Sequence, residues 1–179
     1  RAALSGLGVP CPRWSLAQDS ADVHAFGDSV GWPVVIKTSR GGYDGKGVWV
    51  VRDRAAADAV MALPLPAGSQ WLVEQHIAFT RELSAQVARS PHGQVVAYPV
   101  VQTTQIDGIC AEVVAPAPGL SDDKALQAQQ VALQIARDLD VVGMLAVELF
   151  DSPDGVVVNE LAMRPHNSGH WPIEAAVTS

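Results

Sequence analysis

Four glycines within seven residues, Gly-Gly-Tyr-Asp-Gly-Lys-Gly at 41–47, constrain the fold of this chain more than any other feature. The segment lies between two runs rich in β-branched residues, 32–38 and 47–51, and each run predicts a strand. A short connection between two strands predicts an antiparallel hairpin, and Asp44-Gly45 is itself a strong turn signal. Because four glycines exceed what a turn needs, we expect either mobility or a close approach of the backbone to another group.

The same segment is also a candidate phosphate-binding loop. It lacks the G-x-x-x-x-G-K-[ST] pattern, and it lies between two strands, so no helix N-terminus is available to the phosphate. Backbone N–H groups and Lys46 still offer donors to phosphate oxygens. Lys37, in the preceding strand, is either a second cation for the same anion or a lysine whose ammonium group reaches solvent at the strand edge.

The rest of the sequence predicts strands and two helices. A helix at 52–63 is ended by Pro64, and apolar positions at helical spacing, with Ser121 as the N-cap, predict a second helix at 122–139 that packs on a sheet. In 82–90 the apolar residues alternate, with Leu83, Ala85 and Val87 on one face. Further strands are expected at 70–77, 82–90, 95–101, within 109–120, at 144–150 and at 156–161.

This order of elements favours an α+β fold, because hairpins with inserted helices differ from the regular alternation of a doubly wound sheet. A proline-rich break before Trp71 predicts two domains, 1–70 and 71–179. The chain begins at Arg1 without a methionine, and we expect it to be a fragment.

The charge distribution indicates a small anionic ligand. A net charge of -7 argues against nonspecific nucleic-acid binding, whereas 37–54 holds five basic and two acidic residues. No apolar run approaches the roughly 20 residues that span a bilayer, so we expect no membrane partner. Cys11 and Cys110 match no metal-ligand spacing and are typical of thiols in a reducing compartment, which favours a cytoplasmic protein.

Two carboxylates are predicted to face each other in the hairpin across Asp-Ser-Pro-Asp-Gly at 151–155. A register with 148 opposite 158 places Glu148 and Glu160 diagonally on one face. Two facing carboxylates repel each other unless a cation binds between them, and Mg²⁺ with nucleotide phosphates would suit such a pair. The alternative is that both glutamates are solvated surface side chains. Asn159 points away in a regular strand, so its use as a ligand requires a bulge or a strand end. The predicted buried face consists of Leu145, Val147, Leu149, Val157 and Leu161.

The polar run Arg-Pro-His-Asn-Ser-Gly-His at 164–170 is more typical of a substrate-binding loop than of a turn. Metal binding by His166 and His170 is an alternative, but no helix is expected there to present both side chains together.

Taken together, VVIKTSRGGYDGKGVWVV, VEQHIAFTREL, VELF and VNELAMRPHNSGHW resemble the ATP-grasp enzymes. Within that superfamily they are most similar to the 5-(carboxyamino)imidazole ribonucleotide synthase family of purine biosynthesis. The resemblance implies a small subdomain whose glycine-rich loop closes over ATP and a larger subdomain with an antiparallel sheet. It also implies an ATP-dependent C–N ligase that uses Mg²⁺ and bicarbonate to carboxylate the exocyclic amine of 5-aminoimidazole ribonucleotide, with carboxyphosphate as the reactive intermediate.

Two alternatives stay open. One is another ATP-grasp ligase, such as a biotin carboxylase or a formate-dependent ribonucleotide transformylase, which should differ in the substrate loop. The other is a noncatalytic nucleotide-binding module. The family also suggests a homodimer for the full-length protein.

The resemblance assigns the ATP contacts to three places. The hinge, whose main chain would meet the adenine, is Glu74, Gln75, His76 and Ile77, and Glu82 would hold the ribose hydroxyls. Gln105 stands where some members have a histidine, so no ATP contact is assigned to it. The phosphates would contact Lys37 and the loop residues Gly42, Tyr43, Asp44, Gly45, Lys46, Gly47 and Val48.

The resemblance also assigns the metal and the substrates. The Mg²⁺ ligands would be Glu148, Glu160 and Asn159. The positions around the ribonucleotide and bicarbonate would be Tyr43, Asp44, Arg164, His166, Asn167 and Ser168, with Lys46 also assigned to catalysis.

Overall fold

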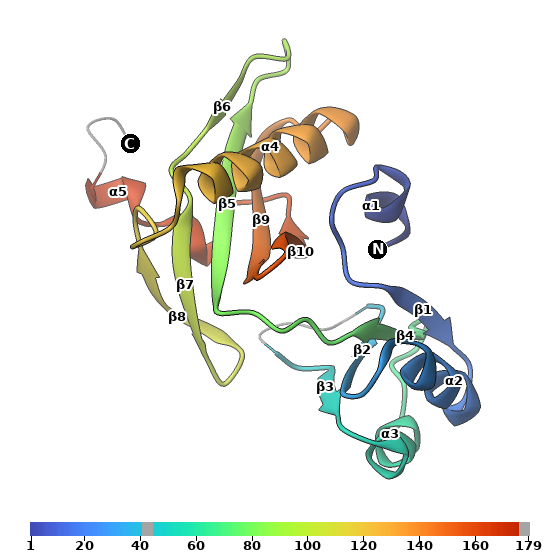
Figure 1. Ribbon diagram of the computed structural model, residues 1–179. Coiled ribbons are helices and arrows are strands. Elements are labelled where there is room, and N and C mark those ends of the chain that lie inside the picture. The colour runs from blue at the N-terminus through green and yellow to red at the C-terminus, as the bar shows by residue number, and fades with distance from the viewer. Residues whose placement is uncertain (41–44, 176–179) are drawn as a thin grey trace. The chain divides into compact units, whose positions relative to one another are not determined.

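Two antiparallel sheets organise the protein, and each belongs to its own unit. The structure, a computed structural model, describes residues 1–40 and 45–175 (Figure 1). Unit 1 comprises Arg1–Cys11, Ala78–Ile106 and Cys110–Ser179, and unit 2 comprises Pro12–Ile77 and Asp107–Ile109. Helices and antiparallel strands occur in both units, which confirms the α+β fold.

Unit 2 contains a four-stranded sheet in the order β1-β4-β2-β3. The predicted hairpin is present, because Val34 pairs with Val51 and Lys37 with Val48. Apolar side chains from the strands and from two helices form the core on one face, with Val23, Val34, Ile36, Ala57 and Val73 fully buried. The elements are β1 (Trp14–Ala17), α2 (Ser20–Val30), β2 (Val34–Thr38), β3 (Val48–Val51), α3 (Arg54–Met61) and β4 (Trp71–Gln75).

The contacts divide the chain differently from the sequence-based division into 1–70 and 71–179. β4 pairs with both β1 and β2, which places it inside the sheet of unit 2 rather than at the start of the next domain. The chain passes into unit 1 after Ile77, and the N-terminal segment up to Cys11 also belongs to unit 1. Composition marks the proline-rich loop before β4, whereas strand pairing decides where β4 belongs.

Unit 1 is built on a six-stranded sheet with the order β10-β9-β5-β7-β8, and β6 also pairs with β5. α4 lies across one face of this sheet (Figure 1). Its fully buried residues Ala128, Ala132 and Ile135 pack against the sheet, as predicted for the helix at 122–139. The elements are α1 (Ala2–Gly6), β5 (Arg81–Arg89), β6 (Val95–Ala97), β7 (Val101–Ile106), β8 (Ile109–Val114), α4 (Asp122–Asp138), β9 (Gly143–Ser152), β10 (Gly155–Ala162), the 3₁₀ turn η1 (Asn167–Gly169) and α5 (Pro172–Ala175).

The prediction of a single strand at 95–101 is wrong. β6 ends at Ala97 and β7 begins at Val101. Pro99 stands in the gap, and proline cannot donate a hydrogen bond to a sheet ladder. Val95 and Val96 of β6 are exposed.

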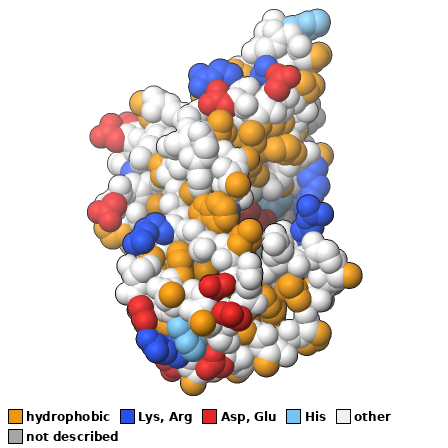
Figure 2. Space-filling model, turned by 90° about the vertical axis from the view of Figure 1, so that its right-hand side faces the viewer, with side chains coloured by type: hydrophobic (Ala, Val, Ile, Leu, Met, Phe, Trp, Pro, Cys, Tyr) orange, Lys and Arg blue, Asp and Glu red, His pale blue; other side chains and the backbone are white. Residues whose placement is uncertain are grey.

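The surface carries charges of both signs. On the face drawn in Figure 2, lysine and arginine side chains lie scattered among acidic, apolar and uncharged ones. Within residues 1–40 and 45–175, none of the helices combines the length and the apolar character that crossing a membrane requires.

Ser121 caps α4, since its side chain accepts a hydrogen bond from the backbone N–H of Lys124. We expect Ser121→Ala to lower the free energy of unfolding by about 1 kcal/mol, because one N–H group at the helix start loses its acceptor. Urea denaturation of the two proteins measures the difference. Ser121→Asp keeps a good capping residue and should retain the stability of the wild type; equal losses in both variants would contradict the cap.

Candidate active site

β5 separates a polar face of unit 1 from an apolar one. Leu83, Ala85 and Val87 are fully buried in the core, which confirms the predicted alternation. The intervening side chains, on the opposite face, are Glu82, Ser84 and Gln86. This polar row was not predicted, although a polar residue at every second position of a strand with an apolar opposite face signals it.

The two glutamates of the neighbouring hairpin lie directly opposite each other, not diagonally. Glu160 pairs with Glu148, whereas Val158 pairs with Leu149, so one extra residue is inserted between them at Asn159. The predicted register, with 148 opposite 158, is therefore wrong. Asn159 lies at a β-bulge. A bulge or a strand end at this position is the requirement for Asn159 to serve as a ligand.

The bulge decides which face Glu160 occupies. Val158 is 0% exposed and belongs to the apolar core. In a regular strand Glu160, two residues later, would point to that same core. The extra residue turns Glu160 to the face of Glu148 instead. The predicted buried face is correct for Leu145, Val147 and Leu149. It is wrong for Val157, which is half-buried, because Val156 and Val158 fill the core instead. Leu161 is partly buried and packs at the edge of the core.

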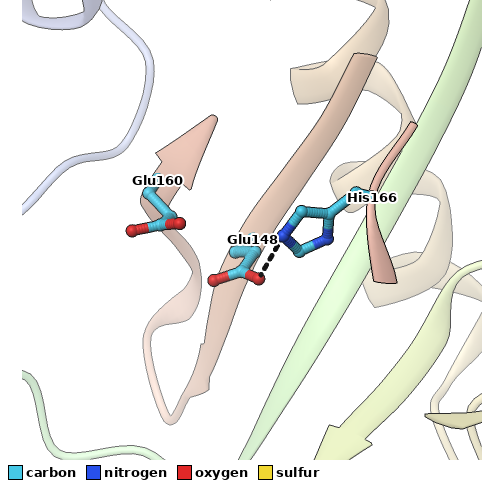
Figure 3. Close-up of side chains that lie close together, drawn as sticks. All are labelled: Glu148, Glu160 and His166. Carbon is cyan, nitrogen blue, oxygen red and sulfur yellow. Dashed lines mark ion pairs between the residues drawn. The ribbon is translucent and has the colours of Figure 1, made fainter. Parts of the chain in front are cut away.

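Glu148, Glu160 and His166 form one cluster of potential metal ligands (Figure 3). One ligand atom from each residue lies within 4.8 Å of the others, and His166 Nε2 is 3.3 Å from Glu148 Oε1. The side chains come from β9, β10 and the segment before η1. Two carboxylates directly opposite each other, with Asn159 at the bulge, are oxygen donors of the kind that Mg²⁺ and Ca²⁺ prefer. The residues therefore fit a divalent cation.

His166, which the sequence considered as a metal ligand only together with His170, instead joins the carboxylates, and His170 is not a member of the cluster. Burial lowers the pKa of His166, and Arg164 and His170 lower it further, while Glu160 opposes the shift. The neutral imidazole is thus favoured. Arg164 and Asn167 are exposed, and Asn167 Oδ1 accepts a hydrogen bond of 2.9 Å from the Ser168 N–H.

Glu82 lies in a half-buried position on the polar face of β5. Burial raises the pKa of Glu82, and a hydrogen bond from Gln105 of β7 opposes this effect. Gln105, to which the sequence assigned no ATP contact, is thus the partner of the residue expected to hold the ribose. Burial also raises the pKa of the Cys110 thiol, as do the charges of Glu148 and Glu82.

Lys37 in unit 2 has an acidic partner that the sequence did not suggest. Its Nζ lies 2.8 Å from Glu74 Oε2, and Glu74 is 2% exposed. Lys37 of β2 pairs with Leu72 of β4, so Glu74 is its diagonal neighbour on the same face. Glu74, expected to act through its main chain, therefore also uses its side chain to balance the charge of Lys37. Gln75 ends β4, and His76 and Ile77 follow outside the strand.

The glycine loop is described only in its second half. Gly45 and Gly47 have positive φ angles of 73° and 80°, which glycine adopts without strain. A Cβ on Gly47 would lie 2.6 Å from Thr38 Oγ1, so a larger residue does not fit there. Lys46 precedes Gly47, and Val48 begins β3. The predictions for Gly42, Tyr43 and Asp44 lie outside the described residues.

Comparison with known proteins identifies the class. The family model of the ATP-grasp domain matches residues 2–179. The chain belongs to the ATP-grasp family, as the sequence motifs indicated.

The most informative relatives are N5-carboxyaminoimidazole ribonucleotide synthases. The enzyme of Mycobacterium tuberculosis is 53% identical over 180 residues, which cover 100% of this chain and 42% of that protein. A crystal structure of an ADP complex of such a synthetase has a TM-score of 0.86 at 33% identity, covering 99% of this chain and 47% of the other. The Aspergillus clavatus enzyme, in complex with ADP and 5-aminoimidazole ribonucleotide, has a TM-score of 0.85 at 29% identity, covering 97% of this chain and 45% of the other. The chain thus spans less than half the length of these relatives.

Proposed function

We propose that this ATP-grasp domain belongs to an enzyme that carboxylates 5-aminoimidazole ribonucleotide in purine biosynthesis, using ATP and bicarbonate. The observation that carries the proposal is the 53% identity to the Mycobacterium tuberculosis synthase over the whole chain, substrate loop included. The clustering of Glu148, Glu160 and His166 supports it, since it joins the loop at 164–170 to the paired carboxylates.

The acidic face of unit 1 is proposed to hold Mg²⁺ through Glu148, Glu160 and Asn159. Bound there, the metal would neutralise the charge of the ATP phosphates. Lys37, Lys46 and the backbone from Gly42 to Val48 are proposed to contact the phosphates. The Glu82 carboxylate, which accepts a hydrogen bond from Gln105, would also accept hydrogen bonds from the ribose hydroxyls. The adenine would contact the main chain of Glu74, Gln75, His76 and Ile77.

The proposed reaction has two group transfers. A bicarbonate oxygen takes the γ-phosphoryl group of ATP, ADP leaves, and carboxyphosphate forms. The exocyclic amine of the ribonucleotide then attacks the carboxyl carbon, the C–O bond to phosphate breaks, inorganic phosphate leaves, and the nitrogen loses a proton. Tyr43, Asp44, Arg164, His166, Asn167 and Ser168 are proposed to hold the two acceptors, with the exposed guanidinium of Arg164 suited to an anionic group.

The assignment carries three further proposals. The metal is Mg²⁺, because the carboxylate-rich donor set suits a hard cation. The enzyme acts in the cytoplasm, in line with the two cysteines without a metal-ligand pattern. The complete gene product is a homodimer, as the family resemblance suggests.

The test measures ADP release by the complete gene product with ATP, Mg²⁺ and bicarbonate. We expect release to depend on 5-aminoimidazole ribonucleotide and to match its consumption one for one, because the amine is the final acceptor. The matched control is the imidazole ribonucleotide that lacks the 5-amino group, which should leave only the background rate. Equal rates with and without the amine would refute the substrate assignment and leave the ATP-grasp family intact.

A further inference from the structure

Polar groups from β5 and from the segment 166–168 of unit 1 meet around the hydroxyl of Ser168. Its Oγ lies 2.9 Å from Ser84 Oγ, 3.1 Å from Gln86 Nε2 and 2.8 Å from His166 Nδ1. Ser84 and Ser168 are fully buried, and Gln86 is nearly so. The other ring nitrogen of His166 faces Glu148. The cluster thus connects the polar row of β5 to the paired carboxylates.

The capacity of each group to donate or accept fixes the direction of this chain of contacts. The backbone N–H of Ser168 donates to His166 Nδ1 at 3.4 Å, so Nδ1 is an acceptor and the ring proton belongs on Nε2, which faces Glu148 Oε1 at 3.3 Å. Nδ1 is then the acceptor, and the Ser168 hydroxyl donates to it. Ser168 Oγ keeps two lone pairs, which match its two remaining neighbours: the Gln86 amide N–H and the Ser84 hydroxyl both donate.

We propose that Ser84 and Gln86 are positioning residues of the active site, which hold the Ser168 hydroxyl so that it orients His166 with Nε2–H toward Glu148. Neither residue touches a substrate in this proposal; both act through Ser168. The effect on turnover rests on the proposed function, whereas the orientation of the ring does not.

The energetics of the cluster favour a functional role over a stabilising one. Gln86 Oε1 is buried and has no hydrogen-bond partner among the described residues, which costs folding free energy. A Cβ on Gly169 would lie 2.7 Å from that oxygen, so a larger residue at 169 would displace the Gln86 amide from its present position. An apolar side chain at 86 would avoid the unsatisfied oxygen, so the Gln86 amide is best explained by its hydrogen bond to the Ser168 hydroxyl.

The first test uses the metal-free protein. Long-range ¹H–¹⁵N spectra of the His166 ring should show the Nε2–H tautomer in excess by at least about tenfold, because the other tautomer turns a lone pair toward Glu148. A majority of the Nδ1–H tautomer would reverse the donors and acceptors along this series of hydrogen bonds and overturn the proposal. This measurement involves no substrate, so it stands or fails independently of the reaction.

The second test is the double variant Ser84→Ala/Gln86→Met. We expect kcat to fall at least about tenfold while KM for ATP changes less than about twofold, because the ring keeps its tautomer and loses its fixed orientation. Its ¹⁵N resonances should broaden. Gln86→Met alone should not lower Tm, since the orphaned oxygen disappears.

Two comparisons keep the second test specific. Ser152→Ala removes another buried serine hydroxyl, which donates to the Gly155 carbonyl, and it should leave the His166 resonances and kcat unchanged. Restoring Ser84 in the double variant should recover part of the lost rate. Unchanged kcat in the double variant, or a loss of rate matched by a comparable loss in Ser152→Ala, would overturn the positioning role.

Discussion

Asp151→Asn is expected to lower the free energy of unfolding by about 3 kcal/mol, because it removes the anion from a buried cluster with two cations. Asp151 is 3% exposed. One carboxylate oxygen accepts from Arg81 Nε at 2.9 Å, and the other pairs with Lys124 Nζ. The cluster joins β9, β5 and the first turn of α4, so the loss should appear as a lower midpoint in urea denaturation of unit 1.

The same carboxylate predicts a pH dependence. Burial raises the pKa of Asp151, but the hydrogen bonds and charges of Lys124 and Arg81 outweigh burial and hold it below its ordinary value. A depressed folded-state pKa contributes stability that is fully present above the unfolded value of about 3.9. That contribution declines as pH falls from there through the folded pKa. The difference between wild type and Asp151→Asn should therefore be constant from pH 7 to 5 and shrink below about pH 4.

Asp140→Asn is the matched control. Asp140 also pairs with an arginine, Arg89, at 2.8 Å, but its side chain is 86% exposed. Its positive φ of 50° suits asparagine as well as aspartate. A pair whose carboxylate lies in solvent contributes about 0–1 kcal/mol, and Arg89, 16% exposed, keeps its hydrogen bond to the Val141 carbonyl. This variant should therefore change the unfolding midpoint little at any pH. Equal losses in the two variants would show that burial does not set the strength of the Asp151 cluster.

The parts of the fold that depend on local pattern could be predicted from the sequence. The glycine-rich hairpin follows from two β-branched runs around a turn signal, and the apolar face of β5 follows from Leu83, Ala85 and Val87. That Glu148 and Glu160 lie in facing strands also follows from the turn signal at 151–155, whereas the face that they share depends on the bulge. Periodicity is sufficient for such features.

The parts of the fold and of the site that depend on pairing between distant residues could not be predicted from the sequence. One extra residue at Asn159 reverses the face of everything after it, and no local signal marks the bulge. Glu74 becomes the partner of Lys37 only because β4 lies beside β2, across 37 positions of sequence. Gln86, Ser84 and Ser168 meet for the same reason, since a serine and a glutamine in a strand predict no particular partner.

The bulge at Asn159 also creates a repulsive pair of carboxylates, Glu148 and Glu160, and cation binding would explain that arrangement. Like charges directly opposite each other in a sheet destabilise it, and the bulge at Asn159 is what brings Glu160 opposite Glu148 instead of into the core. Because burial disfavours charging of His166, it is poorly suited to balance the two carboxylates. A cation bound at the proposed metal site would supply the missing charge.

Glu160→Gln is therefore expected to reduce ATP turnover by the complete gene product at least about tenfold at limiting Mg²⁺, or roughly 1.4 kcal/mol in the barrier. The amide keeps the shape of the side chain and removes the charge that the cation requires. Part of the rate should return at high Mg²⁺, because weaker binding is compensated by concentration. Mn²⁺ titration followed by electron paramagnetic resonance measures the affinity directly, without turnover, and should show a similar loss.

Stability separates this metal role from a structural one. Since Glu148 and Glu160 repel each other in the metal-free protein, Glu160→Gln should leave the unfolding midpoint unchanged or raise it. The control Glu112→Gln removes an exposed carboxylate from β8 of the same unit and should change neither Mn²⁺ affinity nor turnover. Mn²⁺ affinity that is the same in wild type and Glu160→Gln would remove Glu160 from the metal site. Activity lost together with stability would mean that the carboxylate supports the hairpin, which the repulsion across β9 and β10 argues against.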